Sequence, residues 1–282
     1  MGDNVFIMKD NIYNKYGGLV IAKGTKIILD DKTIDRLVKM GIDFKEIANE
    51  SRATKITPHS KETQEMKRVG NEMLKENSIL ERISFTDTTY IETTKNVEKA
   101  IFNGKNSSWH IYLKSFYNAL PWYYSHSINV AIISSYLATK LGFSMDSIDS
   151  IIVGSLLHDI GMMLVPKSII SKQKNSLTEY DEEILKRHCE MGYSIVLDSG
   201  IPELSKKIIL QHHELIDGSG YPNRFKDKQI IKEAKIVMLS DIFDLQTYSL
   251  KGKDTNIIIE SMISNTSKYP YEYVKVLKAA FK

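Results

Sequence analysis

Seven histidines are the residues of this 282-residue chain whose types and spacing could perform chemistry. Five of them lie between residues 126 and 213, where two adjacent pairs occur: His158 with Asp159, and His212 with His213. Neighbouring residues on a helix point about 100° apart, so the two members of a pair can flank one cavity. Imidazole and carboxylate groups together suit first-row divalent ions. The pattern therefore favours a metal site, whereas a single helical histidine is more often an ordinary core or surface residue.

Two aspartates lie in apolar segments where an acid has no other evident purpose. Asp159 ends the segment IIVGSLLHDIG, and Asp241 lies within IVMLSDIFDLQ. An unpaired buried carboxylate is costly, whereas binding to a metal ion compensates its charge. We therefore interpret both aspartates as candidate ligands, although spacing alone does not bring the segments together.

The elements that must position these residues are predicted to be helices. Apolar residues recur at helical spacing in residues 128–137 and again in residues 148–156. Thr178, with Asp181 three residues later, is typical of a helix start. We expect that helix to continue through Ile184, Leu185 and His188.

The N-terminal part has a different pattern, which predicts a small α+β module. Residues 5–22 indicate two short strands around a turn with Gly17 and Gly18, and a helix is expected to end near Gly41. The polar residues 50–63 are the predicted linker. The expected division is an α+β module over residues 1–50, a linker with connecting helices over 51–105, and a helical domain over 106–282.

Composition excludes several classes of protein. With 42% hydrophobic and 26% charged residues, the chain is predicted to be globular. Its formal charge of +3, with both signs interspersed, does not indicate a nucleic acid polymer as partner. The single cysteine, Cys189, excludes a disulfide framework and a thiolate zinc cluster, and we interpret it as pointing away from the site. Without a leader peptide or a run of about 18 apolar residues, a cytoplasmic protein without membrane insertion is expected.

Two longer motifs resemble the HD-GYP family, a branch of the HD metal-dependent phosphohydrolases. They are HDIG at residues 158–161 and HHELIDGSGYP at residues 212–222, and SDIFD at residues 240–244 also follows the family pattern. The similarity extends over residues 120–250 or so. It implies a mainly α fold with an HD-type helical bundle, and hydrolysis of the bacterial second messenger cyclic di-GMP to linear pGpG or GMP.

The resemblance also implies roles for individual residues. The implied metal ligands are His126, His158, Asp159, His188, His212, His213 and Asp241. Asp159 would bridge two ions, commonly iron or manganese, which share a hydroxide that attacks the phosphate in line; His158 and Asp159 are thus the implied catalytic centre. Tyr221 could line the substrate pocket or simply pack, and Lys253 could hold a phosphate or be a solvated surface lysine.

Three residues depart from the family pattern. Met162 replaces the lysine that follows HDIG, Leu250 stands where an arginine is usual, and Trp122 replaces a glutamate of three-metal members, which favours two ions here. Loss of one charged contact to the transition state can cost on the order of 10²–10³ in rate.

Two functions therefore remain open at this stage. One is an active phosphodiesterase for cyclic di-GMP or another cyclic dinucleotide. The other is a weak or inactive module that binds a cyclic dinucleotide or a partner protein. Signalling proteins or a second copy of the chain are the expected protein partners.

Overall fold

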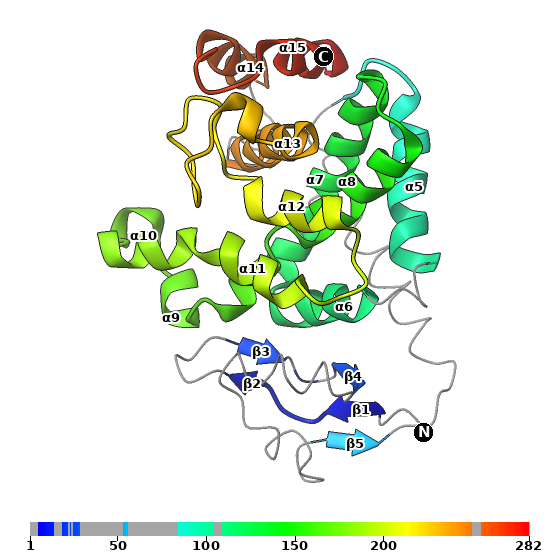
Figure 1. Ribbon diagram of the computed structural model, residues 1–282, viewed down its shortest axis with the longest axis vertical. Helices are drawn as coiled ribbons and strands as arrows, with labels where there is room; N and C mark the ends of the chain where they lie inside the picture. Colours follow the sequence, from blue (N-terminus) through cyan, green and yellow to red (C-terminus); the bar gives the residue numbers. More distant parts are fainter. Residues whose placement is uncertain are drawn as a thin grey trace.

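The computed structural model describes residues 5–13, 19–21, 23, 25–28, 53–55, 84–103, 109–249 and 255–281. Within these residues the fold is mainly helical, and short strands gather at the N-terminal end (Figure 1). The strands are β1 (Val5–Met8), β2 (Ile12–Tyr13), β3 (Leu19–Ile21), β4 (Lys26–Ile28) and β5 (Ala53–Lys55). The α-helices are α5 (Thr89–Asn103), α6 (His110–Ala119), α7 (Pro121–Lys140), α8 (Met145–Leu157), α9 (Lys167–Ile170), α10 (Glu179–Lys186), α11 (His188–Val196), α12 (Glu203–Gln211), α13 (Lys232–Ser249), α14 (Thr255–Ser264) and α15 (Tyr271–Ala280). Short 3₁₀ helices are η2 (Ile160–Leu164), η3 (Lys174–Ser176) and η4 (Asp227–Gln229). The expected mainly α fold is confirmed.

The N-terminal strands form two small antiparallel sheets. β1 lies between β4 and β5, and β2 pairs with β3. The two strands expected in residues 5–22 are in fact three, because bends at Lys9 and Asp10 separate β1 from β2. The helix expected to end near Gly41 lies outside the described residues.

Part of the predicted linker belongs to this N-terminal sheet. β5 lies within residues 50–63 and pairs with β1, so this segment is not a free connection. Strand pairing uses backbone groups and does not require apolar side chains, which is why the polar sequence gave no signal. The connecting helix α5 packs against α7.

α7 is the central helix of the described bundle. Every residue from Tyr124 to Ala138 is buried, and α5, α6, α8, α13 and α15 pack around it. The apolar segments predicted at residues 128–137 and 148–156 are confirmed as buried parts of α7 and α8. α7 also buries polar residues such as Ser134, so its burial extends beyond the single apolar face that the spacing predicts.

Several helices end or begin close to one another in the middle of the bundle. α8 ends at Leu157, and the chain turns through His158 and Asp159 into η2, which packs against α11. α12 packs against both α8 and α11. Chain turns that carry the motif residues are thereby brought together.

α10 begins where the sequence predicts and ends earlier. Thr178 and Asp181 form a reciprocal capping box at its start, which confirms that prediction. However, α10 ends at Lys186, and His188 opens the separate helix α11, so the expectation of one helix through His188 is wrong. The His188 ring donates a hydrogen bond from Nδ1 to the Leu185 carbonyl. In a continuous helix this carbonyl would instead accept from the backbone N–H four residues later.

One helical stretch, Met145–Leu164, is long and apolar enough to cross a membrane by length and composition alone. It comprises α8 and η2, and 78% of it is buried within the protein. A core helix of a packed bundle has the same length, apolar composition and burial.

Candidate metal centre

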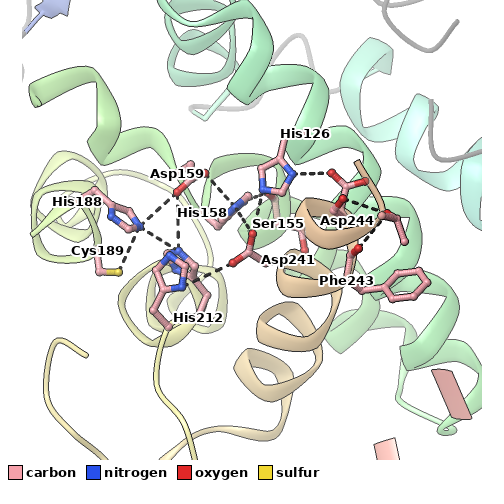
Figure 2. Close-up of polar contacts among 12 residues, drawn as sticks. His126, Ser155, His158, Asp159, His188, Cys189, His212, Asp241, Phe243 and Asp244 are labelled. Carbon is pink, nitrogen blue, oxygen red and sulfur yellow. Dashed lines mark hydrogen bonds and ion pairs between the residues drawn. The ribbon is translucent and has the colours of Figure 1, made fainter. Parts of the chain in front are cut away.

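The structure brings all seven implied metal ligands together in one cluster, and Figure 2 labels all of them except His213. They come from five segments: His126 from α7, His158 and Asp159 from the turn between α8 and η2, His188 from α11, His212 and His213 from the turn that follows α12, and Asp241 from α13. Six of them are buried, and the His213 side chain is 21% exposed.

Asp159 lies at the middle of this cluster and divides it into two sides. Its Oδ1 atom is 3.3 Å from Nε2 of His188 and 3.9 Å from Nε2 of His212. Its Oδ2 atom is 3.3 Å from Nε2 of His158, which lies on the other side with His126. One carboxylate can therefore contact two ions, one through each oxygen.

Three of the imidazole rings are oriented by the same local contact. In each, Nδ1 donates a hydrogen bond to the carbonyl of the residue three positions earlier: His158 to Ser155 at 2.7 Å, His188 to Leu185 at 2.6 Å, and His212 to Ile209 at 2.9 Å. In the neutral form of these rings the proton is on Nδ1, and the Nε2 atom keeps a lone pair. All three lone pairs are thus directed into the cluster, as metal binding requires.

The cluster contains buried polar atoms that the protein itself does not satisfy. Nε2 of His158 and Oδ2 of Asp241 are buried without a hydrogen-bond partner. Nε2 of His188 and Nε2 of His212 are 3.2 Å apart, although both carry lone pairs in the tautomers just described. Such an arrangement is costly on its own and is compensated by a cation. The residues present therefore fit a metal ion.

His126 is held between two carboxylates. Its Nδ1 atom donates to Asp244 at 2.7 Å, and its Nε2 atom donates to Asp241 at 3.0 Å in the protonated ring. Burial lowers the pKa of His126, but the hydrogen bonds to Asp241 and Asp244 outweigh it and raise that pKa to about 10. An ion that binds Nε2 would replace this proton, while the contact with Asp244 would keep the ring in place.

The remaining charges also suit a cation. Burial, followed by the neighbouring His213, lowers the pKa of His212 well below its usual value, and burial with His188 does the same for His213. Neutral imidazole is the form that binds metals. Burial by itself would raise the pKa of Asp159, but His158 and then His188 hold it well below its usual range. Asp159 is therefore a carboxylate.

Cys189 lies beside the cluster and does not point away from it. Its Sγ atom is 3.4 Å from Nε2 of His188, and the side chain is fully buried. The earlier interpretation is wrong because the His188 ring turns back toward the Leu185 carbonyl, which places Nε2 next to the thiol. Burial and then the nearby Asp159 raise the pKa of the thiol.

The loop at residues 217–226 covers one side of the cluster through Tyr221. The Tyr221 ring lies 4.7 Å from the His213 ring and 6.2 Å from the His188 ring. The loop is held by Glu214, a fully buried carboxylate that accepts hydrogen bonds from the backbone N–H groups of Asn223 and Phe225. A substrate contact of Tyr221 remains a prediction.

Sequence analysis missed Asp244, Glu214 and the thiol of Cys189 as parts of the site. Asp244 follows Asp241 by three residues, so both lie on one face of α13, and this spacing is the signal that could have found it. Glu214 has no such signal, because its partners are backbone groups nine and eleven residues later.

The residues that depart from the family pattern have different surroundings. Met162 is buried and packs with Val165 and Ile169. Trp122 stacks on the His126 ring at 5.7 Å and contacts Tyr248 at 5.8 Å. Lys253, Leu250 and His59 lie outside the described residues, and His110 donates to the Ile101 carbonyl, as expected of an ordinary residue.

Comparisons with known proteins agree on one family. The HD domain family matches residues 115–268, more than half of the chain. A cyclic di-GMP phosphodiesterase of Thermotoga maritima is 32% identical over 159 residues, covering 56% of this chain and 38% of the relative. The 3'3'-cGAMP-specific phosphodiesterase 2 of Vibrio cholerae is 34% identical over 159 residues, covering 54% and 30%. The chain therefore spans well under half of these relatives' length.

A solved structure has a similar fold. It is an HDG"Y"P protein from Bdellovibrio bacteriovorus, with a TM-score of 0.50 and 18% identity, covering 98% of this chain and 93% of that one.

Proposed function

Because this chain belongs to the HD domain family and carries both HD-GYP motifs, we propose that it is a metal-dependent phosphodiesterase that hydrolyses cyclic di-GMP to linear pGpG or GMP. One observation carries the proposal, namely the convergence of imidazole lone pairs and carboxylate oxygens on Asp159. The relatives named above, a cyclic di-GMP phosphodiesterase and a 3'3'-cGAMP-specific phosphodiesterase, support the class of substrate.

The proposed centre holds two divalent ions, iron or manganese, with Asp159 between them. The ligands proposed for one side are His126, His158, Asp159 and Asp241, and those for the other are Asp159, His188, His212 and His213. When bound, such ions supply an activated water and neutralise the charge that develops on the phosphoryl group. Imidazole nitrogens and carboxylate oxygens are ligands that suit both iron and manganese.

The chain's own residues prepare this chemistry in three ways. The carbonyls of Ser155, Leu185 and Ile209 fix the ring tautomers before an ion or substrate arrives. Asp244 orients His126 from behind. Tyr221 excludes water from the side of His213 and, together with Lys253, is the proposed substrate contact.

A second function is supported by the environment of Met162. The family's lysine would lie at this position, but Met162 is buried among apolar side chains and offers no charge to a phosphate. The second candidate is therefore a module that binds a cyclic dinucleotide, a signalling protein or a second copy of the chain with slow or no turnover. For either function we propose a cytoplasmic location; the burial of Met145–Leu164 supports a core helix at this place rather than a membrane span.

Turnover of defined nucleotides tests the proposal. Protein loaded with Fe²⁺ or Mn²⁺ is incubated with cyclic di-GMP and, separately, with 3'3'-cGAMP, and products are separated by chromatography. Linear product from the wild type and none from Asp159→Ala supports the phosphodiesterase. Binding without cleavage by both metal forms supports the second candidate instead, and absence of both binding and cleavage overturns the phosphodiesterase and the cyclic-dinucleotide-binding module alike. Lys275→Ala, an exposed change on α15, serves as the matched control and should behave as wild type.

A further inference from the structure

We propose that Cys189 is a thiolate ligand of one of the two ions, on the side of the centre formed by His188 and His212. The centre would then bind its ions through nitrogen, oxygen and sulfur, with Cys189 as an eighth ligand beside the five histidines and two aspartates. This inference rests on the proposed metal centre, because a thiol without an ion nearby has no such role.

The distances around His188 match those of a single coordination sphere. From Nε2 of His188, the distances are 3.4 Å to Sγ of Cys189, 3.2 Å to Nε2 of His212 and 3.3 Å to Oδ1 of Asp159. A tetrahedral ion with bonds of about 2.3 Å to sulfur and about 2.0 Å to nitrogen or oxygen separates its ligand atoms by about 3.3–3.6 Å. The thiol therefore lies at the distance from His188 that two ligands of one ion would have.

The surroundings of the thiol differ from those of an ordinary core cysteine. His188, Cys189, His212 and His213 each offer one ligand atom, and these atoms all lie within 4.8 Å of one another. Cys189 is fully buried, so its sulfur faces this group rather than solvent.

An independent observation also indicates a cation at this place. Next to this group, Oδ2 of Asp241 is buried without a hydrogen-bond partner, 3.6 Å from Nδ1 of His213. The Nδ1 atoms of His188 and His212 donate to backbone carbonyls, so in the neutral rings neither Nε2 atom carries a proton. These two Nε2 atoms then face each other without a hydrogen bond between them. A cation compensates both features, whereas a neutral S–H group that donates to Nε2 of His188 satisfies only that lone pair and leaves His212 and Asp241 uncompensated.

The binding step needs no oxidant or reductant. The S–H bond of Cys189 breaks, its proton leaves to solvent, and the sulfur electron pair forms the bond to the ion, so one proton is released for each ion bound in this way. A thiolate is a softer ligand than imidazole or carboxylate, and it favours Zn²⁺ or Fe²⁺ over Mn²⁺ on this side of the centre.

Cobalt spectroscopy on the whole chain tests this assignment directly. The protein is titrated with Co²⁺, and the near-ultraviolet charge-transfer absorption of a cobalt–thiolate bond is followed together with the visible bands of bound cobalt and the metal content. Cys189 is the only cysteine of the chain, so any thiolate band belongs to it. We expect the band in the wild type and its complete loss in Cys189→Ser and Cys189→Ala, with cobalt still bound.

The outcomes separate this inference from the proposed function. Bound cobalt without a thiolate band in the wild type overturns the role of Cys189 and leaves the centre of histidines and aspartates standing. No bound cobalt, in a sample whose circular dichroism shows folded protein, overturns both. Because the decisive measurement is made on the wild type, a variant that fails to fold does not affect it.

Discussion

At the scale of single residues, the positions of protons on the imidazole rings set the chemistry of this site. A ring whose Nδ1 is held by a carbonyl presents one defined lone pair, as in His158, and a ring between two carboxylates, as His126 is, keeps both protons until an ion replaces one. Asp244 is thus a positioning residue for His126.

Replacing Asp244 by asparagine should weaken metal binding. The neutral amide holds the Nδ1–H of His126 less firmly, and loss of such an outer contact typically lowers metal affinity by about 10- to 100-fold. Calorimetric titration with Mn²⁺ measures the change. The matched control is Asp149→Asn, an exposed change on α8, which should leave the affinity at the wild-type value; an equal affinity for both variants would remove the role given to Asp244.

At the scale of elements, the site depends on how closely η2 approaches α11. A Cβ atom at Gly161 would lie 1.9 Å from the carbonyl oxygen of His188 and 2.6 Å from the backbone N of Gly192. Both are backbone atoms, so a side chain can be accommodated only if the two elements separate. The glycine of the HDIG motif therefore sets the distance between the halves of the centre.

Gly161→Ala should reduce both stability and metal affinity. Overpacking typically costs about 1–3 kcal/mol, and the displaced α11 carries His188 away from Asp159. Urea unfolding and metal titration measure the two effects. Gly142→Ala is the control: its φ of +73° makes a side chain unfavourable by about 1 kcal/mol, but its Cβ meets nothing within 4 Å, so metal affinity should not change.

The loop that carries Tyr221 should depend on Glu214 in a similar way. In Glu214→Gln one backbone N–H of the loop loses its carboxylate acceptor, and a buried donor left unsatisfied costs about 1–3 kcal/mol. Urea unfolding should show this loss, whereas Glu190→Gln, an exposed change on α11, should not. If the two variants unfold at the same urea concentration, Glu214 does not hold the loop.

At the scale of the whole molecule, the segment before α5 is tied to the central helix and to the C-terminal end. Asp87 accepts hydrogen bonds from Tyr136 and Lys140 of α7, and Phe85 packs against Phe281. Hydrogen bonds from Lys140 and Thr89 hold the pKa of the Asp87 carboxyl well below its usual value of 3.8. The segment before α5 therefore contacts both α7 and the C-terminal end of the bundle, and α15 also packs against α7.

This contact predicts a defined dependence of stability on pH. Because the pKa of Asp87 is lower in the folded state than in the unfolded state, its contribution is present above about pH 4 and is lost as the pH falls toward the folded-state pKa. The free energy of unfolding of Asp87→Asn should therefore be lower than that of the wild type at pH 7, and the difference should shrink steadily below pH 4. A difference that stays constant down to pH 2 would assign the effect to packing instead.

The sequence by itself determined the helices with apolar faces and the start of α10 at Thr178. Its resemblance to a known family predicted the seven residues that the structure brings together. These features are local, because helical periodicity, capping and adjacent pairs of ligands depend only on residues that are close together in the sequence. Only the tertiary structure decided that β5 joins β1, that the chain breaks between α10 and α11, and that Asp244, Glu214 and Cys189 belong to the site. Each of these depends on backbone pairing, a ring turned onto a carbonyl, or contact between helix ends far apart in the chain, and such contacts leave no periodic signal in the sequence.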